Sequence, residues 1–387
     1  MKSVLFSFLL LISVSSMGQI RLSDAAEIRI LTCGPYQPEL YSAFGHSAIR
    51  VHDPEVGIDY LFNYGVFDFR QPNFYLNFAR GYLNYQLAVT DYSYFRDAYI
   101  NDNRYIHEQI LNLTAEEKQK FFDFLQWNMQ PENRFYYYDY FYDNCATRVR
   151  DALVRTFGDA IEFDGSYVNT TYTIRDLTDL YLEQQPWGDL GIDLCLGLPM
   201  DTLATPYMYM FLPDYIEKGF DNAYIIRDGS RIPLVRETVV TYESNPEPDH
   251  SSLVTPFIAF SALLILGAWL TWKDYRNRKR FVWFDFILFT VVGLVGWLLA
   301  LLWLVTDHNA AAQNLNLLWA IPLYFPLSFW ILRSPVSRWV RRIFMVTAGL
   351  MVILVCIWFF LPQDLHDSLI PITMLLGIRS WRISKPN

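Results

Sequence analysis

Long apolar runs dominate the last third of the chain. Four runs are each long enough to cross about 30 Å of hydrocarbon as a helix, and they cover residues 253–272, 281–305, 314–332 and 343–361. A fifth, weaker run covers residues 365–378 and contains Asp367 and Pro371. The pattern predicts an all-α transmembrane domain of about five helices over residues 251–387. The segment PEPDH at 246–250 is typical of a linker before it.

Basic residues are concentrated in every second connection between these predicted spans. The loops at 273–280 and 333–342 and the tail after Ile378 carry five, four and three Lys or Arg residues, whereas the loops at 306–313 and 362–368 carry none. Short loops rich in Lys and Arg stay on the cytoplasmic side of a membrane. We therefore expect the first 250 residues to lie on the exported side together with Asp307, His308 and His366. Five spans place the basic tail inside, which favours counting the weak fifth run as a span.

The first 18 residues resemble an export signal. They contain one Lys, an apolar run over 4–14, and the small residues Ser16 and Gly18, which predicts a signal peptide (1–18) cleaved near Gly18. A membrane anchor is the alternative, but the apolar run is shorter than the about 20 residues that a span needs. We expect the mature exported domain to cover residues 19–250.

The exported domain changes its hydrophobic period near residue 114. Before that point, alternating or β-rich segments predict strands at 27–32, 46–51, 59–64, 82–89 and 105–111. After it, Thr114 and Glu117 have the spacing of a capping box and start a helix that ends before Pro131. A second helix is predicted from Asn144 to Phe157, with Gly158 as its C-terminal cap. The arrangement predicts an α+β domain in which helices pack on a largely antiparallel sheet.

Composition agrees with a membrane protein and excludes one class of partner. Of the 387 residues, 52% are hydrophobic and 18% charged, against roughly 45–50% and about 25% in ordinary soluble domains. The net charge of −9 is opposite in sign to the field that recruits nucleic acid. We therefore predict no nucleic-acid partner.

Cys145 is the most informative residue for chemistry. With Asn144 as N-cap it lies in the first turn of the second helix, where free backbone N–H groups and the helix dipole favour a thiolate. Val149, Ala152 and Leu153 follow at helical spacing, so the sulfur heads an apolar stripe that faces the sheet. A buried structural cysteine is the alternative. Cys33, Cys145 and Cys195 lie in the exported domain and Cys356 in a span, so at least one exported thiol is unpaired within the monomer.

A cysteine nucleophile needs a base, and histidine has a suitable pKa. The six histidines are His46, His52, His107, His250, His308 and His366. Among those within the exported domain, His52 in a predicted turn and His107 in a polar strand are typical surface residues. His46 starts a strand after Gly45 and is followed by the small residues Ser47 and Ala48, which favours it as the base.

A third group is expected to orient the imidazole through its other nitrogen. If strands 46–51 and 59–64 pair about the intervening turn, Asn63 lies roughly opposite His46, and Asp59 is the alternative. Which face of the first strand is apolar stays open, because Ile49 and Val51 alternate with His46.

Several segments in one order resemble a known family. They are TCGPYQPELYSAFGHSAIRV (32–51), FNYGVFDF (62–69), FARGYLNYQL (78–87), DNCATRVRD (143–151) and NLNLLWAIPL (314–323). Together these resemble the Lnb-type lipoprotein N-acyltransferases of the Bacteroidetes over nearly the whole chain. The exported domain also resembles a permuted papain-like fold of the NlpC and lecithin:retinol acyltransferase kind, in which His precedes Cys.

The resemblance implies a cysteine acyltransferase in the bacterial inner membrane with its catalytic domain in the periplasm. It matches His46 and Cys145 to the family's catalytic motif and leaves Asn63 or Asp59 unsettled. Cys33 lies in the matching TCGP segment and stays open as a second essential residue, although no helix start activates it. The implied acyl donor is a membrane phospholipid, and the acceptors are diacylglyceryl-modified lipoproteins. No cofactor or metal is expected, because no Cys or His pair has zinc-ligand spacing and no Gly-rich phosphate loop is present.

Other interpretations of the same residues remain. The runner-up enzyme is a membrane-anchored cysteine amidase or endopeptidase acting on peptidoglycan, since the same Cys–His chemistry cleaves amides. A non-enzymatic membrane protein that binds a lipid or partner is a third possibility. Asp307 and His308 either contribute to a site at the membrane surface or simply cap a solvated loop.

Overall fold

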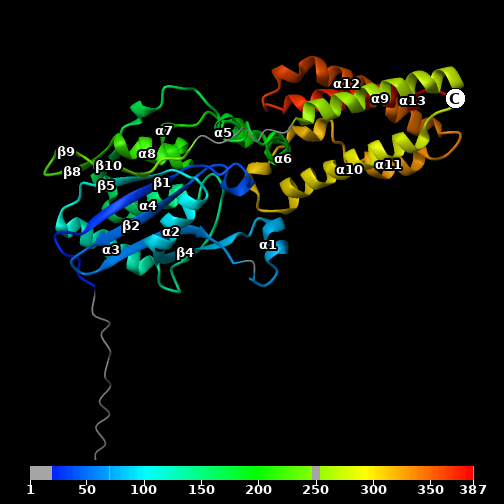
Figure 1. The fold of residues 1–387 in the computed structure, drawn as a ribbon. Helices are drawn as coiled ribbons and strands as arrows, with labels where there is room; N and C mark the ends of the chain where they lie inside the picture. The colour runs from blue at the N-terminus through cyan, green and yellow to red at the C-terminus, as the bar shows by residue number, and fades with distance from the viewer. Residues whose placement is uncertain (1–19, 69, 246–252, 387) are drawn as a thin grey trace, which may run out of the picture.

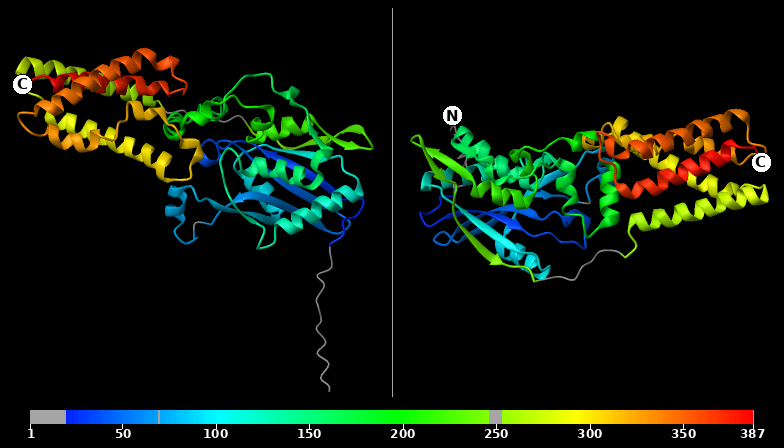
Figure 2. Two further views of the ribbon diagram at one scale, coloured as in Figure 1. Left: turned by 180° about the vertical axis from the view of Figure 1, so that it is seen from behind. Right: turned by 90° about the horizontal axis from the view of Figure 1, so that it is seen from above.

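The computed structural model describes residues 20–68, 70–245 and 253–386. The predicted signal peptide (1–18) and the linker (246–250) lie outside the described residues. Figures 1 and 2 show two regions next to each other, one built on a sheet and one of long helices packed side by side. The C-terminus lies at the end of the helical region away from the sheet.

The sheet is antiparallel throughout, as the alternation along the chain predicts. Over the described residues, the main sheet has seven strands in the order β10-β5-β1-β2-β3-β4-β6, and a second sheet has three in the order β7-β8-β9. The strands are β1 Glu27–Cys33, β2 His46–Asp53, β3 Ile58–Val66, β4 Asn84–Asp91, β5 Ile106–Leu111, β6 Phe135–Tyr137, β7 Ile161–Phe163, β8 Ala223–Arg227, β9 Ser230–Pro233 and β10 Val235–Tyr242. The expected α+β class of this part is confirmed.

The same part of the chain contains helices of different lengths. They are α1 Phe74–Arg80, α2 Tyr92–Asn101, α3 Ala115–Asn128, α4 Cys145–Phe157, α5 Ile174–Asp179, α6 Pro186–Cys195, α7 Pro206–Tyr209 and α8 Pro213–Asp221. The predicted start of α3 is confirmed, because the Thr114 side chain accepts from the Glu117 N–H while the Glu117 carboxylate accepts from the Thr114 N–H. This capping box satisfies backbone donors that a helix start otherwise leaves free.

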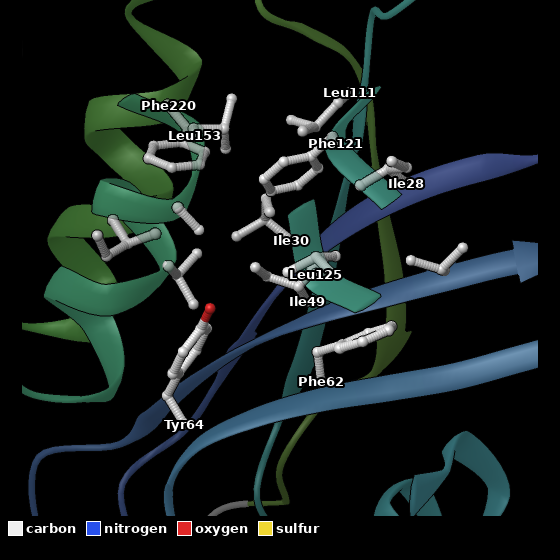
Figure 3. Close-up of a cluster of buried hydrophobic side chains, with 14 of the residues drawn as sticks. Ile28, Ile30, Ile49, Phe62, Tyr64, Leu111, Phe121, Leu125, Leu153 and Phe220 are labelled. Atoms are coloured by element: carbon white, nitrogen blue, oxygen red, sulfur yellow. The ribbon is translucent and has the colours of Figure 1, made fainter. Parts of the chain in front are cut away.

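The two faces of the main sheet carry different cores. One face packs on α3, α4 and α8 in a large apolar cluster that includes Ile49, Val51 and Phe62. Figure 3 shows Ile49 and Phe62 in this cluster. The other face packs on α2 in a smaller cluster that includes Leu31 and Ala48. Since side chains alternate along a strand, His46 shares the α2 face with Ala48. The structure therefore shows which side chains of β2 face the large core and which face α2, a question that the sequence left open.

The region after residue 252 is helical, and its described part contains five α-helices. They are α9 Pro256–Asn277, α10 Val282–Val305, α11 Tyr324–Ile331, α12 Arg338–Ile357 and α13 Ile370–Ser384. Among the described residues, three segments are long and apolar enough to cross a membrane, namely Pro256–Asn277, Val282–Val305 and Arg338–Phe360.

The prediction of one continuous third span over 314–332 was wrong. That segment forms a short 3₁₀ helix, Leu315–Leu318, and then the eight-residue α11. Pro322 lies between the two and lacks the N–H that a continuing helix needs. The polar start of the segment is bound to α6, because Asn314 Nδ2 donates to the carbonyl of Leu194 at 2.7 Å.

The fifth predicted run forms α13, which extends six residues beyond the predicted end at Ile378. Two of the three basic residues of the predicted tail, Arg379 and Arg382, belong to α13 and are buried. Arg379 pairs with Asp274 of α9 at 2.9 Å and with Asp285 of α10 at 2.6 Å. Burying a guanidinium is costly unless it is paired, so these ion pairs join α9, α10 and α13.

The loops without Lys or Arg contact the sheet-bearing part. The N–H of Gly197 donates to the carbonyl of Ala310 at 2.7 Å, and the N–H of Asp364 donates to Asp201 Oδ1 at 2.8 Å. His366 Nε2 lies 3.2 Å from Asp189 Oδ2. Both loops predicted to share the exported face therefore adjoin the predicted exported domain.

Candidate active site

The start of α4 is built by its own N-cap. The Asn144 side chain accepts from the N–H of Thr147 at 2.9 Å, and Thr147 Oγ1 accepts from the N–H of Asn144 at 2.8 Å. Asn144 Nδ2 also donates to the carbonyls of Tyr140 and Phe211, each at 2.8 Å. These bonds make Cys145 the first residue of α4, as predicted. The bonds to Tyr140 and Phe211 also fix the start of the helix to two other segments of the chain. The buried stripe of Val149, Ala152 and Leu153 then directs the helix toward the sheet.

His46 is held at the first position of β2. Gly45 before it has φ +80°, and a Cβ at that position would lie 2.6 Å from the Cys33 carbonyl oxygen, so only glycine fits there without strain. The imidazole ring lies 6.2 Å from the Phe95 ring and 6.3 Å from the Tyr99 ring of α2. Strand and helix together therefore confine the ring.

Asn63 contacts the imidazole directly. His46 Nε2 lies 2.7 Å from Asn63 Oδ1. An amide oxygen only accepts, so Nε2 carries the proton in this contact, and Nδ1 is the nitrogen left to exchange a proton with another group. The alternative partner Asp59 lies elsewhere, because its two carboxylate oxygens accept from Arg50 at 2.7 and 2.9 Å. The structure thus brings Asn63, and not Asp59, to His46.

The register of this contact differs from the expectation. Ile49 pairs with Phe62, and continuing that register places Asn63 opposite Ala48 rather than His46. The Asn63 side chain reaches His46 diagonally on the α2 face of the sheet. The recorded β2–β3 pairing ends at Ile49 and Phe62, which leaves the start of β2 available to α4.

Opposing effects act on the Cys145 thiol. Burial raises the pKa of Cys145, but the charge of His46 and a hydrogen bond with its side chain lower it, as do hydrogen bonds from the backbone N–H groups of Ser47 and Ala146. The net result is a pKa below the ordinary value of a cysteine. This is the environment in which a thiol becomes a nucleophile.

Tyrosine side chains lie near Cys145. A Cβ at Gly65 would lie 3.6 Å from both Cys145 Cβ and Tyr138 Cε2, which places the Tyr138 ring beside the cysteine. Burial first, and then the charge of Cys145, raises the pKa of Tyr136, Tyr138 and Tyr140. These tyrosines stay neutral and form a largely apolar wall.

Cys33 lies near Cys145 without sharing its environment. It pairs with His46 in the β1–β2 ladder and is fully buried. Burial raises the pKa of Cys33 far above the ordinary value, and the opposing charge of Arg104 does not offset it. Among the described residues, Cys33, Cys145, Cys195 and Cys356 are all free thiols.

The remaining candidates lie away from the sulfur. His52 belongs to β2 rather than to the predicted turn and lies 3.6 Å from an Asp59 oxygen. His107 lies 3.0 Å from Glu217. The N–H of Asp307 donates to the carbonyl of Arg80 at the end of α1, so the loop that carries Asp307 and His308 adjoins α1.

One group of carboxylates was not singled out from the sequence. Among the described residues, Asp179, Asp189 and Asp193 each place an oxygen within 4.8 Å of the others. Burial, and then the charges of Asp193 and Asp189, raise the pKa of Asp179 to about 9. Asp193 pairs with Arg175 at 2.7 Å and Asp189 lies 3.2 Å from a ring nitrogen of His366, so two of the carboxylates already have partners within the chain. Asp189 and Asp193 are spaced i, i+4 on α6, which was the one signal that their side chains share a face.

Comparison with known protein families gives a match on each part of the chain. The family model described as the Lnb N-terminal periplasmic domain matches residues 19–179, and the one described as the Lnb transmembrane domain matches residues 248–385. His46, Asn63 and Cys145 all fall within the first match. No curated protein and no solved structure matches the chain.

Proposed function

We propose that this chain, which belongs to the Lnb family of lipoprotein-maturation membrane proteins, is a lipoprotein N-acyltransferase. Its nucleophile is a cysteine. It moves an acyl chain from a membrane phospholipid to the α-amine of the lipid-modified N-terminal Cys of lipoproteins. The observation that carries the proposal is the grouping of Cys145, His46 and Asn63 at the start of α4. We assign residues 19–250 to a periplasmic catalytic domain and 251–387 to a multi-pass domain in the inner membrane.

The first half-reaction loads the enzyme. His46 Nδ1 takes the proton of Cys145, and the thiolate attacks the carbonyl carbon of a phospholipid ester. The N–H groups of Ser47 and Ala146 lie next to the sulfur, where they can stabilise the oxyanion of the tetrahedral intermediate. The carbon–oxygen bond then breaks, His46 returns the proton to the leaving oxygen, and lysophospholipid departs. The acyl chain remains on Cys145 as a thioester.

The second half-reaction transfers the chain. The α-amine of a diacylglyceryl-modified lipoprotein attacks the thioester, His46 accepts a proton from the amine, and Cys145 leaves as a thiolate. Asn63 keeps the imidazole oriented with Nδ1 toward the sulfur in both steps. Every bond and proton balances between the two substrates, so the scheme requires no further reactant.

The membrane region fits the substrates of this scheme. Both donor and acceptor are anchored in a bilayer by their acyl chains, and transfer between them requires the sulfur to stay close to the membrane surface. The contacts between the loops at 306–313 and 362–368 and the sheet-bearing part support such a fixed position.

Trapping the loaded intermediate tests the proposal. The full-length protein is incubated with phospholipid vesicles, digested, and its peptides are analysed by mass spectrometry. We expect an acyl adduct on the peptide that contains Cys145, lost in Cys145→Ala and retained in the matched control Cys33→Ala. An adduct that persists in Cys145→Ala contradicts the scheme.

Lipoproteins from a deletion strain separate this function from the alternatives. Loss of the N-linked acyl chain supports the acyltransferase. Unchanged lipoproteins with altered muropeptides support the peptidoglycan amidase or endopeptidase instead. Full complementation by both Cys145→Ala and His46→Ala supports a non-enzymatic role.

A further inference from the structure

The short helix α1 is strongly apolar and almost uncovered. It has seven residues, none of them buried. The exposed fractions of Tyr75, Leu76 and Phe78 are 77%, 57% and 50%. Helices this short are unstable without packing, and clustered exposed apolar side chains mark an interaction surface. Something outside the chain is therefore expected to cover α1.

The position of α1 indicates what covers it. The carbonyl of Arg80, its last residue, accepts from the N–H of Asp307 at 2.9 Å. A Cβ at Gly81, which has φ +85°, would lie 3.0 Å from the Asp307 carbonyl carbon, so glycine permits this close approach. Asp307 follows α10 by two residues. The end of α1 is thus fixed at the end of a helix that belongs to the transmembrane domain.

The apolar surface continues from α10 onto α1. Leu304 and Val305, the last residues of α10, are each 70% exposed, as expected for side chains that face lipid in a spanning helix. Figures 1 and 2 show α1 projecting from the sheet beside this end of α10. Lipid that surrounds the end of α10 therefore also reaches Tyr75, Leu76 and Phe78.

Polar groups at the base of α1 suit the level of lipid headgroups. Arg80 is exposed and its guanidinium lies 4.9 Å from the centroid of the Tyr82 ring. Tyrosine and arginine side chains concentrate where a bilayer meets water, since the ring is amphipathic and the cation attracts lipid phosphate. Along α1, Asn77 is the one polar residue before Arg80, and the others are apolar or aromatic; this order matches a segment that dips into a leaflet with Arg80 at its surface.

A series of aromatic rings joins α1 to the sulfur. The Phe74 ring lies 6.0 Å from Phe67, Phe67 lies 5.0 Å from Tyr85, and Tyr85 lies 4.6 Å from Tyr138. The Tyr138 ring in turn lies beside Cys145. Each contact is between side chains that present apolar surface, so the series offers an acyl chain continuous apolar contact.

We propose that α1 inserts into the periplasmic leaflet of the membrane and that a phospholipid acyl chain reaches Cys145 along the rings of Phe74, Phe67, Tyr85 and Tyr138. The insertion of α1 stands on its own geometry. The delivery of the acyl chain rests on the proposed acyltransferase function.

Photo-crosslinking tests the insertion without relying on catalysis. A benzophenone amino acid replaces Tyr75 in full-length protein that also carries Cys145→Ala, reconstituted in vesicles of phosphatidylethanolamine and phosphatidylglycerol. The control site is Tyr94 on α2, which is also 77% exposed. We expect phospholipid adducts at position 75 and only background at position 94. Equal yields at the two sites, or adducts at position 75 to a second copy of the chain, would overturn the proposal.

Acyl transfer from vesicles tests the delivery. Leu76→Asp is expected to lower the ratio of the rate with vesicle phospholipid to the rate with a detergent-dispersed donor by about tenfold, because the charge opposes burial of this position in lipid. Tyr94→Asp is expected to leave the ratio unchanged. A ratio in Leu76→Asp equal to that of the wild type overturns the delivery. If wild-type protein forms no acyl enzyme while position 75 still crosslinks to lipid, the proposed function fails and the insertion of α1 is supported.

Discussion

The end of β1 and the start of α4 bring two cysteines to the same part of the protein, and the two thiols have opposite properties. Burial acts on both Cys33 and Cys145 and raises the pKa of each. At Cys33 burial prevails, whereas at Cys145 the charge and hydrogen bond of His46 and two backbone N–H groups outweigh it. Burial alone therefore does not decide whether a cysteine is inert. A nearby cation does not decide it either, since the charge of Arg104 lowers the pKa of Cys33 without overcoming burial. The difference lies in the hydrogen bonds that Cys145 receives from an imidazole and from backbone N–H groups.

The backbone explains why only one cysteine has these donors. Cys33 ends a central strand that pairs with β2 and β5, so its neighbouring N–H groups belong to the sheet. Cys145 begins a helix, where the first N–H groups, that of Ala146 among them, lack intrahelical acceptors. Its other backbone donor, the N–H of Ser47, comes from the start of β2. The comparison predicts that four substitutions differ in effect by orders of magnitude.

Removal of the Cys145 sulfur is expected to have the largest effect. Cys145→Ala lowers the rate of acyl transfer by about 10,000-fold, since loss of a covalent nucleophile leaves only binding and oxyanion stabilisation. The measurement is the rate of N-acylation of a diacylated lipopeptide by reconstituted protein. Normal expression and an unchanged unfolding temperature show that the loss is chemical. Retained activity at this position would remove the basis of the comparison.

His46→Ala is expected to lower the rate by about 1000-fold, because a general base contributes on this scale. The same change has a second consequence for the thiol. Burial acts unopposed by the imidazole, so the pKa of Cys145 rises, and the pH at which iodoacetamide alkylates the Cys145 peptide moves upward. Peptide mass spectrometry over a pH series measures the profile. An unchanged profile would show that His46 does not activate the sulfur.

Loss of the Asn63 amide is expected to cost up to about 100-fold, since a mispositioned catalytic group reduces the rate on this scale. Asn63→Ala frees the imidazole to rotate while leaving sulfur and base in place. Asp59→Asn is the matched control from the same strand, because Asp59 holds Arg50 rather than His46. Steady-state rates of the two variants are compared. Equal losses in both would assign the effect to the strand rather than to the orientation of His46.

Cys33→Ala is expected to have the smallest effect. The rate changes by less than about threefold, and the free energy of unfolding falls by about 1 kcal/mol because a buried side chain is shortened. Chemical denaturation and the acyl-transfer assay measure the two quantities separately. An inactive but stable Cys33→Ala variant would make Cys33 a second essential thiol and end the contrast with Cys145.

The local sequence determined where several helices begin, which segments form strands and which region is helical and apolar. Asn144 and Thr147 set the start of α4 through bonds within four residues, and the Thr114–Glu117 pair does the same for α3. Alternation along β1, β2 and β3 predicted strands, and the apolar runs predicted a helical membrane region. His46 and Cys145 were predicted as a pair from their local settings and from the family resemblance, and the structure brings them together. Such features are readable because their physical causes lie a few residues apart.

The tertiary structure decided the features that depend on residues far apart in the chain. The packing of α3 and α4 against Ile49 decided the phase of β2, and register then brought Asn63 rather than Asp59 to His46. Asp274 and Asp285 decided that Arg379 is buried rather than solvated. The contact between Arg80 and Asp307 placed the end of α1 beside the end of α10. Hydrophobic pattern specifies that a side chain is buried or exposed, but only the assembled fold specifies which partner it meets.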